Sequence, residues 1–195
     1  MAFVAEHGYP VPTVHSADGS DLIMDHIEGP TMLEALEAAP WKAPGHARVL
    51  AKLQRRLARI EAPPWLLADT ADDAHAHSVL HLDLHPMNVI MSTQGPVVID
   101  WTNAAGGPAG FDAALTHVEI ASFATTSNRE RIGQVVFTRA FRRARGSKLI
   151  DPYIVAACDH RLADRNTLPD ERIAVAALRK KALAGKAARD RSSGV

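Results

Sequence analysis

Apolar side chains recur at intervals of three and four residues between His46 and Ile60. This spacing places them on one face of an α-helix, while basic side chains occupy the other faces. Pro63 and Pro64 end the segment, because proline cannot donate the backbone hydrogen bond that a helix needs. We therefore predict a helix over 46–60 whose apolar stripe packs on a core. The stripe consists of Val49, Leu50, Leu53, Leu57 and Ile60.

Several other segments have helical patterns. Glu34 follows Thr31 at the spacing of a capping box, which predicts that a helix begins in TMLEALEAA. The last residues, 189–195, are expected to be disordered. Four further helices are predicted, over 111–123, 129–145, 152–161 and 169–187.

Strand patterns are shorter and lie in the first half of the chain. VPTVH and LIMDHI flank the turn-rich ADGSD, and they predict a pair of strands. A β-hairpin is predicted from strands over 89–92 and 96–100, joined by a turn at 93–95, and the glycine-rich loop NAAGGPAG follows it. The patterns together predict an α+β fold that is mostly helical, with a small hairpin and a short N-terminal strand pair.

Composition and charge narrow the classes of function. Apolar residues make up 47% of the 195 residues, which is enough for a sizeable core, and the single cysteine, Cys158, excludes an internal disulfide. Neither a secretory signal nor a membrane-spanning run is expected, so we predict a cytoplasmic protein with no membrane partner. The net charge of zero argues against a nucleic-acid partner.

The zero net charge is unevenly distributed along the chain. Residues 1–100 contain 6 Lys and Arg against 13 Asp and Glu, whereas residues 101–195 contain 16 against 9. The basic half includes FRRARGSK and LRKKALAGKAARDR. These stretches are interpreted either as solvated helix faces or as an anion-binding patch.

The stretch HLDLHPMNVI contains the chemistry-bearing residues, and it has two interpretations. One is a zinc hydrolase, because His and carboxylate groups are zinc ligands. The candidate zinc ligands are His75, His77, His81, Asp83 and His85. This interpretation requires a further ligand from elsewhere in the chain, and the remaining histidines form no recognisable motif.

The other interpretation is phosphoryl transfer. Here Asp83 orients and deprotonates an acceptor hydroxyl, while the oxygens of Asn88 and Asp100 hold Mg²⁺. The predicted hairpin carries Asp100, in VVIDW, back towards Asn88, although twelve residues separate them. His81 is expected to bond the loop backbone and to have a structural role.

HLDLHPMNVI and VVIDW resemble the catalytic loop and the metal-binding segment of the aminoglycoside phosphotransferase family. The resemblance implies a protein-kinase-like fold, ATP and Mg²⁺ as cofactors, and a small-molecule hydroxyl as acceptor. It also implies that Asp83 is catalytic and that Asn88 and Asp100 bind the metal. GYPVPTV and IMDHIEGPTMLEAL resemble the hinge between the lobes, with adenine contacts from Met24, Asp25, His26 and Ile27. AAGGPAGFDAAL resembles a segment in which Asp112 ties the loop to the next helix.

The chain departs from the family pattern upstream of the hinge. No GxGxxG loop precedes Asp83, and no lysine lies ahead of the hinge. Residues 1–27 are therefore expected to be a remnant of the N-terminal lobe with the hinge, and residues 28–188 the helical C-terminal lobe. A catalytically impaired, kinase-like binding protein is the alternative function. The open strand edges of 9–27 favour a homodimer.

Overall fold

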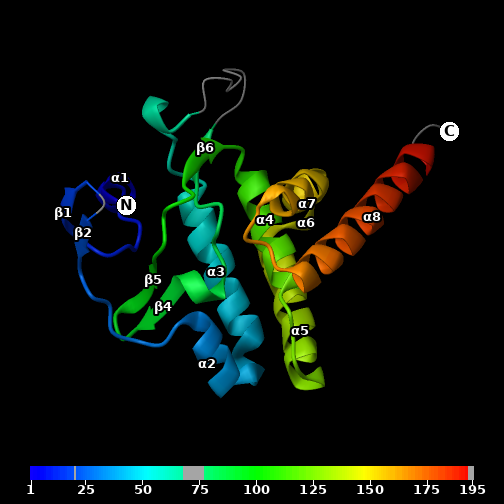
Figure 1. Ribbon diagram of the computed structural model, residues 1–195, viewed down its shortest axis with the longest axis horizontal. Coiled ribbons are helices and arrows are strands. Elements are labelled where there is room, and N and C mark those ends of the chain that lie inside the picture. Colours follow the sequence, from blue (N-terminus) through cyan, green and yellow to red (C-terminus); the bar gives the residue numbers. More distant parts are fainter. Residues whose placement is uncertain (20, 68–76, 193–195) are drawn as a thin grey trace.

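The computed structural model describes residues 1–19, 21–67 and 77–192, with side chains described as far as residue 187. Helices alternate with short strands in the first half, and helices alone follow from residue 109 (Figure 1). Short 3-10 turns lie at Pro40–Lys42, Pro64–Leu66, Pro86–Asn88 (η3) and Asp151–Tyr153 (η4). The strands are β1 (Val14–Asp18), β2 (Asp21–Met24), β3 (Ser78–Leu80), β4 (Val89–Ser92), β5 (Gly95–Val98) and β6 (Ala105–Gly107). The helices are α1 (Ala2–Glu6), α2 (Met32–Ala38), α3 (Ala43–Leu57), α4 (Ala109–Ser122), α5 (Asn128–Arg145), α6 (Ser147–Ile150), α7 (Ile154–Ala163) and α8 (Pro169–Ser192).

The N-terminal strand pair forms as the sequence predicts, with a later start. β1 pairs antiparallel with β2, and Asp18 lies opposite Asp21. The pair begins at Val14 and not within the preceding VPT, because Pro10 and Pro12 have no N–H to donate to a ladder. All four residues of β2 are exposed to solvent.

The segment after β2 is fixed against the β4–β5 hairpin. Gly29 has a φ of +144°, and a Cβ at this position would lie 2.7 Å from the carbonyl oxygen of Met91. Only glycine permits both this conformation and this approach. Thr31 then caps α2, with the reciprocal bonds to Glu34 that the capping-box spacing predicted.

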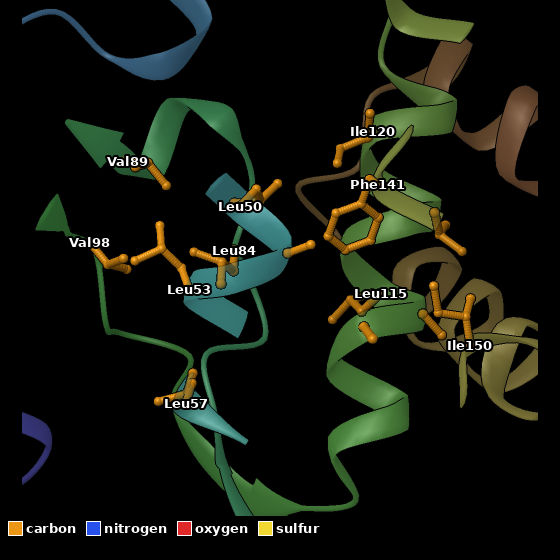
Figure 2. Close-up of a cluster of buried hydrophobic side chains, with 14 of the residues drawn as sticks. Leu50, Leu53, Leu57, Leu84, Val89, Val98, Leu115, Ile120, Phe141 and Ile150 are labelled. Atoms are coloured by element: carbon orange, nitrogen blue, oxygen red, sulfur yellow. The ribbon is translucent and has the colours of Figure 1, made fainter. Parts of the chain in front are cut away.

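The apolar stripe of α3 reaches into the centre of the core. Leu50, Leu53 and Leu57 are buried, and their helix begins at Ala43 and not at His46, because Pro44 is favoured in a first helical turn. Figure 2 shows Leu50 and Leu53 between the hairpin residues Val89 and Val98 on one side and the α4–α5 residues on the other, with Leu57 further along α3. The core therefore joins the hairpin to the helical half.

The β4–β5 hairpin is confirmed, and the glycine-rich loop after it is partly wrong. Ser92 lies opposite Gly95, so the turn has two residues, Thr93 and Gln94. Ala105–Gly107 was expected to be loop, but it forms β6 and pairs antiparallel with β3. Gly106 and Gly107 pack so closely on neighbouring side chains that a Cβ would fall within 3 Å of them, which explains why small residues occupy this strand.

The predicted helices of the second half are confirmed with small shifts in their ends. α4 packs against α5, α7 and α8, and α3 packs against α5. α8 continues to Ser192, beyond the predicted end at residue 187. The observed architecture is a mostly helical α+β fold. Within the described part of the chain, no helix is long and apolar enough to cross a membrane.

Candidate active site

The loop between β3 and β4 is held by a buried carboxylate from α4. Leu82 adopts a φ of +61°, which is uncommon for a residue with a side chain, and its N–H donates to Asp112 Oδ1 at 2.8 Å. Asp112 is buried, and burial raises its pKa although it accepts these bonds. Asp112 thus ties the loop to α4, as the family resemblance implied.

Gln54 of α3 completes this support, and the sequence analysis did not single it out. Its Nε2 lies 3.2 Å from Asp112 Oδ2 and 3.0 Å from Thr116 Oγ1, and the residue is buried. In the sequence, Gln54 could have been noticed as a polar residue within the apolar stripe of Leu50, Leu53 and Leu57. A buried amide in such a stripe needs a partner, and here the partner is the carboxylate that holds the loop.

His81 has the structural role that the sequence analysis expected. It is fully buried, and its Nε2 donates to the carbonyl oxygen of Ile99 at 3.0 Å. Its ring also lies 4.6 Å from the ring of Trp101. Burial lowers the pKa of His81, so the neutral ring with hydrogen on Nε2 is the form that fits. The bond joins the loop to the residue that precedes Asp100.

Asp83 and Asn88 are in direct contact. Asn88 Nδ2 donates to the carbonyl oxygen of Asp83 at 2.8 Å and to its Oδ2 at 3.1 Å. The amide nitrogen therefore faces Asp83, and the amide oxygen of Asn88 faces away from it. The turn η3 ends at Asn88, directly before β4, and it brings Asn88 into contact with Asp83 although the two residues are five positions apart.

His85 occupies the other oxygen of Asp83. His85 Nδ1 accepts the N–H of Met87 at 3.3 Å, so its proton is on Nε2, which lies 3.2 Å from Asp83 Oδ1. Burial alone would raise the pKa of Asp83. The hydrogen bond and charge of His85, together with smaller contributions from His81 and Arg161, outweigh burial and hold the pKa below its ordinary value. Asp83 is therefore an ionised carboxylate at neutral pH.

Asp100 lies beside Asn88 but outside β5. The N–H of Ile99 donates to the carbonyl oxygen of Asn88 at 3.0 Å, so the hairpin brings the two candidate metal ligands onto adjacent backbone positions. Asp100 has a φ of +59°, its side chain is exposed, and its Oδ1 accepts from Thr102 Oγ1 at 2.7 Å. The Asn88 amide oxygen and the Asp100 carboxylate are hard oxygen donors, so this donor set fits Mg²⁺.

The expected hinge residues lie at the end of β2 and beyond it. Met24 pairs with Val14, and the carboxylate of Asp25 is turned back to β1, where it accepts from Thr13 N and contacts His15. These hydrogen bonds, from Thr13 and then His15, lower the pKa of Asp25. Among the described residues, the backbone groups of His26 and Ile27 have no hydrogen-bond partner. These backbone groups could therefore form hydrogen bonds with a planar ligand.

Glu119 is a buried carboxyl group beside the loop that the sequence analysis missed. It is 6% exposed, and within the described structure its Oε2 has no hydrogen-bond partner. Burial, and then the negative charge of Asp83, raise its pKa well above the ordinary value. In the sequence, the only indication was a glutamate within the mostly apolar segment THVEIAS.

The zinc interpretation finds no support in the described structure. His81 is directed to a backbone carbonyl, and His85 contacts Asp83 alone among the candidate ligands. Residues 1–19, 21–67 and 77–192 contain no group of three or more His, Cys, Asp or Glu side chains arranged to hold a metal ion. His75 lies outside the described residues.

In this loop Asp83 is bonded to Asn88, and the backbone of Asp100 lies next to that of Asn88. A comparison with protein families agrees with this geometry. The model of the phosphotransferase enzyme family, APH, matches residues 11–163. The chain belongs to this family. Among curated relatives, the serine/threonine-protein kinase PkaB of Streptomyces coelicolor is 32% identical over 127 residues, or 62% of this chain and 24% of the kinase. The chain thus matches about a quarter of that relative's length.

Solved structures of the family have the same fold. An apo structure of a thermostable mutant of aminoglycoside phosphotransferase APH(4)-Ia has a TM-score of 0.59 at 16% identity, covering 94% of this chain and 82% of that one. The streptomycin–ATP complex of APH(2")-IIa has a TM-score of 0.55 at 12% identity, covering 83% and 70%. The fold is therefore protein-kinase-like, as the motif resemblance implied.

Proposed function

We propose that this chain transfers the γ-phosphoryl group of ATP to a hydroxyl group of a small molecule, in a Mg²⁺-dependent reaction. The observation that carries the proposal is the contact between Asn88 and Asp83. Because the Asn88 amide nitrogen is bonded to Asp83 at 2.8 and 3.1 Å, its oxygen faces away from Asp83 and has no hydrogen-bond partner among the described residues. One side chain thereby orients the base and offers a ligand to a cation.

Each site residue has a separate role in this proposal. Asp83 is the catalytic base, since it is ionised and partly accessible at the loop. Asn88 and Asp100 would hold Mg²⁺, which supplies charge neutralisation on the phosphates when it is bound. Residues 24–27 would bind the adenine through the backbone groups of His26 and Ile27.

The acceptor class rests on the family and on charge. Streptomycin and ATP are bound in the APH(2")-IIa complex, and another structure with this fold, at a TM-score of 0.53, is a glucosamine kinase. The first hundred residues are acidic, which suits a cationic acceptor. We propose an aminoglycoside-like sugar or another small alcohol as acceptor. Residues 1–27 would form the remnant of the N-terminal lobe with the hinge, and residues 28–188 the helical C-terminal lobe. We also propose a cytoplasmic location, where ATP is available.

A transfer assay tests the proposal. The chain is incubated with ATP, Mg²⁺ and a panel of aminoglycosides and smaller amino alcohols, and mass spectrometry detects the gain of one phosphoryl group. Asp83→Asn is expected to lower the rate at least about a hundredfold, because it removes the base. Asp170→Asn, an exposed position at the start of α8, is the matched control and should retain the rate. ATP binding without transfer to any acceptor would support a kinase-like binding protein instead.

The exposed strand pair supports a second copy as partner. Within the described chain, β1 and β2 form a two-stranded sheet, and Leu22 and Ile23 on β2 are 46% and 60% exposed. Unpaired edges with apolar side chains favour pairing with another strand. Size-exclusion chromatography with light scattering should show a dimer that Ile23→Lys dissociates. A monomer over the micromolar range would contradict this part of the proposal.

A further inference from the structure

A large open groove lies between α5 and α8, and the proposed function does not use it. Its volume is about 900 Å³, and its floor is formed by α4, η4 and the start of α7. Figure 1 shows α5 in yellow-green and α8 in orange to red, diverging from the packed helices near α4 and α7. We refer to this feature as the α5–α8 groove.

Each wall of the α5–α8 groove has one helix face that combines apolar and basic side chains. On α5 the lining includes Val135, Arg139 and Arg142, spaced by four and three residues. On α8 it includes Leu178, Lys181 and Ala182, with the same helical spacing. Ile154 and Val155 of α7 add apolar surface to the floor. Apolar side chains therefore make up most of the floor, and basic side chains stand on both walls.

The charge of the groove is strongly positive. Among the described residues, five cationic side chains line it, and Asp151 is the one carboxylate. Asp151 is bonded to Arg142 at 2.5 Å. In the part of the chain that the structure describes, the other four cations have no ion pair, and they are Arg139, Lys148, Lys181 and Lys186.

The groove is separate from the candidate active site. His117 and Ala121, one helical turn apart, face the groove from α4. Asp112, which holds the catalytic loop, and Glu119, which is affected by the charge of Asp83, belong to a different face of the same helix. A ligand in the groove would thus lie across α4 from Asp83.

We propose that the α5–α8 groove binds an acidic amphipathic helix of a partner protein. Such a helix places its apolar side chains on the groove floor and its carboxylates against the unpaired cations, as in other helix-in-groove complexes. A helix about 10 Å across with a pitch of 5.4 Å occupies roughly 420 Å³ per turn, so the groove accommodates about two turns. Two turns present two or three apolar anchors at spacings of three and four residues.

Other anionic partners fit the groove less well. A bilayer surface is flat on this scale and would reach the basic edges without covering the apolar floor. Single-stranded nucleic acids use aromatic side chains for stacking, and the lining contains no Phe, Tyr or Trp among the described residues. An acidic helix satisfies both the apolar floor and the charge.

The test uses a fluorescent 14-residue peptide with leucines at helical spacing and glutamates at the other positions. We expect the 195-residue chain to bind it with a micromolar dissociation constant in fluorescence anisotropy. Two controls are a peptide with lysine in place of glutamate and a scrambled peptide that has no apolar face. Raising NaCl from 50 to 300 mM should weaken binding several-fold, because the edge charges are exposed to solvent.

The chain offers matched variants on neighbouring positions. Lys181→Glu is expected to weaken binding at least about tenfold, whereas Lys180→Glu, on the same helix but outside the groove, changes it less than about twofold. Val135→Ser and Val136→Ser form a second pair, because both residues are 38% exposed and Val135 alone of the two lines the groove.

The binding measurements distinguish an acidic helix from the other occupants. Selective binding of the acidic amphipathic peptide, lost in Lys181→Glu and Val135→Ser but not in their neighbours, supports it. Equal effects of the two variants in either pair would overturn it. So would equal binding of the scrambled peptide. Sedimentation with phosphatidylglycerol vesicles in the absence of peptide binding would overturn it in favour of an anionic surface.

Discussion

His81 joins the two halves of the candidate site through one partly buried hydrogen bond. Its Nε2 lies 3.0 Å from the carbonyl oxygen of Ile99, which precedes Asp100. The loop that carries Asp83 is thereby fixed to the strand end that carries the second proposed metal ligand. The arrangement of the site thus depends on a residue that takes no part in the proposed chemistry.

Removal of this bond should reduce stability. His81→Phe preserves an aromatic ring but leaves the partly buried carbonyl of Ile99 without its donor, so we expect a loss of about 0.5–1.5 kcal/mol in the free energy of unfolding. His81→Gln retains a donor and should lose less. Urea denaturation followed by circular dichroism measures both. Equal stability of His81→Phe and the wild type would show that the bond does not hold the loop.

Gly29 should tolerate no side chain. At a φ of +144°, with a Cβ 2.7 Å from the Met91 carbonyl oxygen, Gly29→Ala is expected to destabilise the fold by at least about 2 kcal/mol. Gly133→Ala is the matched control, since this glycine lies inside α5 with open space around it and should gain up to about 1 kcal/mol. Thermal and urea unfolding compare the two. Similar effects at both positions would contradict the close approach to β4.

His117 should make the fold sensitive to acid. Burial lowers its pKa from the ordinary 6.5 to about 4, so the unfolded chain takes up a proton before the folded chain does. The stabilisation that the neutral His117 side chain provides is present above pH 6.5 and is lost as the pH falls to 4. A shift of this size corresponds to at most about 3 kcal/mol. His117→Leu should flatten the pH dependence of unfolding in this window.

If His117→Leu and the wild type lose the same stability between pH 7 and 4.5, His117 is not the titrating group.

Glu119 should affect the pH dependence of unfolding in the opposite direction from His117. Its pKa is raised in the folded chain, so its stabilisation is complete below the ordinary value of 4.5 and is lost as the pH rises through the folded-state value. Glu119→Gln resembles the protonated form at all pH values. The variant should therefore match the wild type near pH 4 and become the more stable of the two as the pH rises. Urea titrations of the variant and the wild type from pH 4 to 8 measure this divergence, and parallel curves would contradict it.

The local features of the fold were predictable from the sequence. The Thr31–Glu34 capping box and the β4–β5 hairpin are encoded within a few residues, and both are confirmed. The contact between Asp83 and Asn88 follows from their spacing in one loop. β6 was missed because an Ala-Gly-Gly strand has no β-branched or aromatic residue, and its partner β3 lies more than twenty residues away.

Features that depend on distant contacts were not predictable from the sequence. Gln54 and Glu119 are polar helix residues that become important only because the tertiary fold buries them beside the loop. Hydrophobic periodicity does not indicate which loop they approach. The α5–α8 groove depends on the angle between two helices. From the sequence, only the basic charge of its lining was predictable, and an anion-binding patch was one of two interpretations of that charge.

The most direct test of the proposed function is calorimetric titration of the chain with ATP, with and without Mg²⁺, beside Asn88→Ala and Asp100→Asn. Asparagine is chosen at position 100 because it tolerates the φ of +59° better than alanine does. We predict that ATP binding requires Mg²⁺, is weakened at least about tenfold by either variant, and is retained by Asp170→Asn. ATP binding that is independent of Mg²⁺ and of both residues, or no binding by the folded chain, would contradict the account.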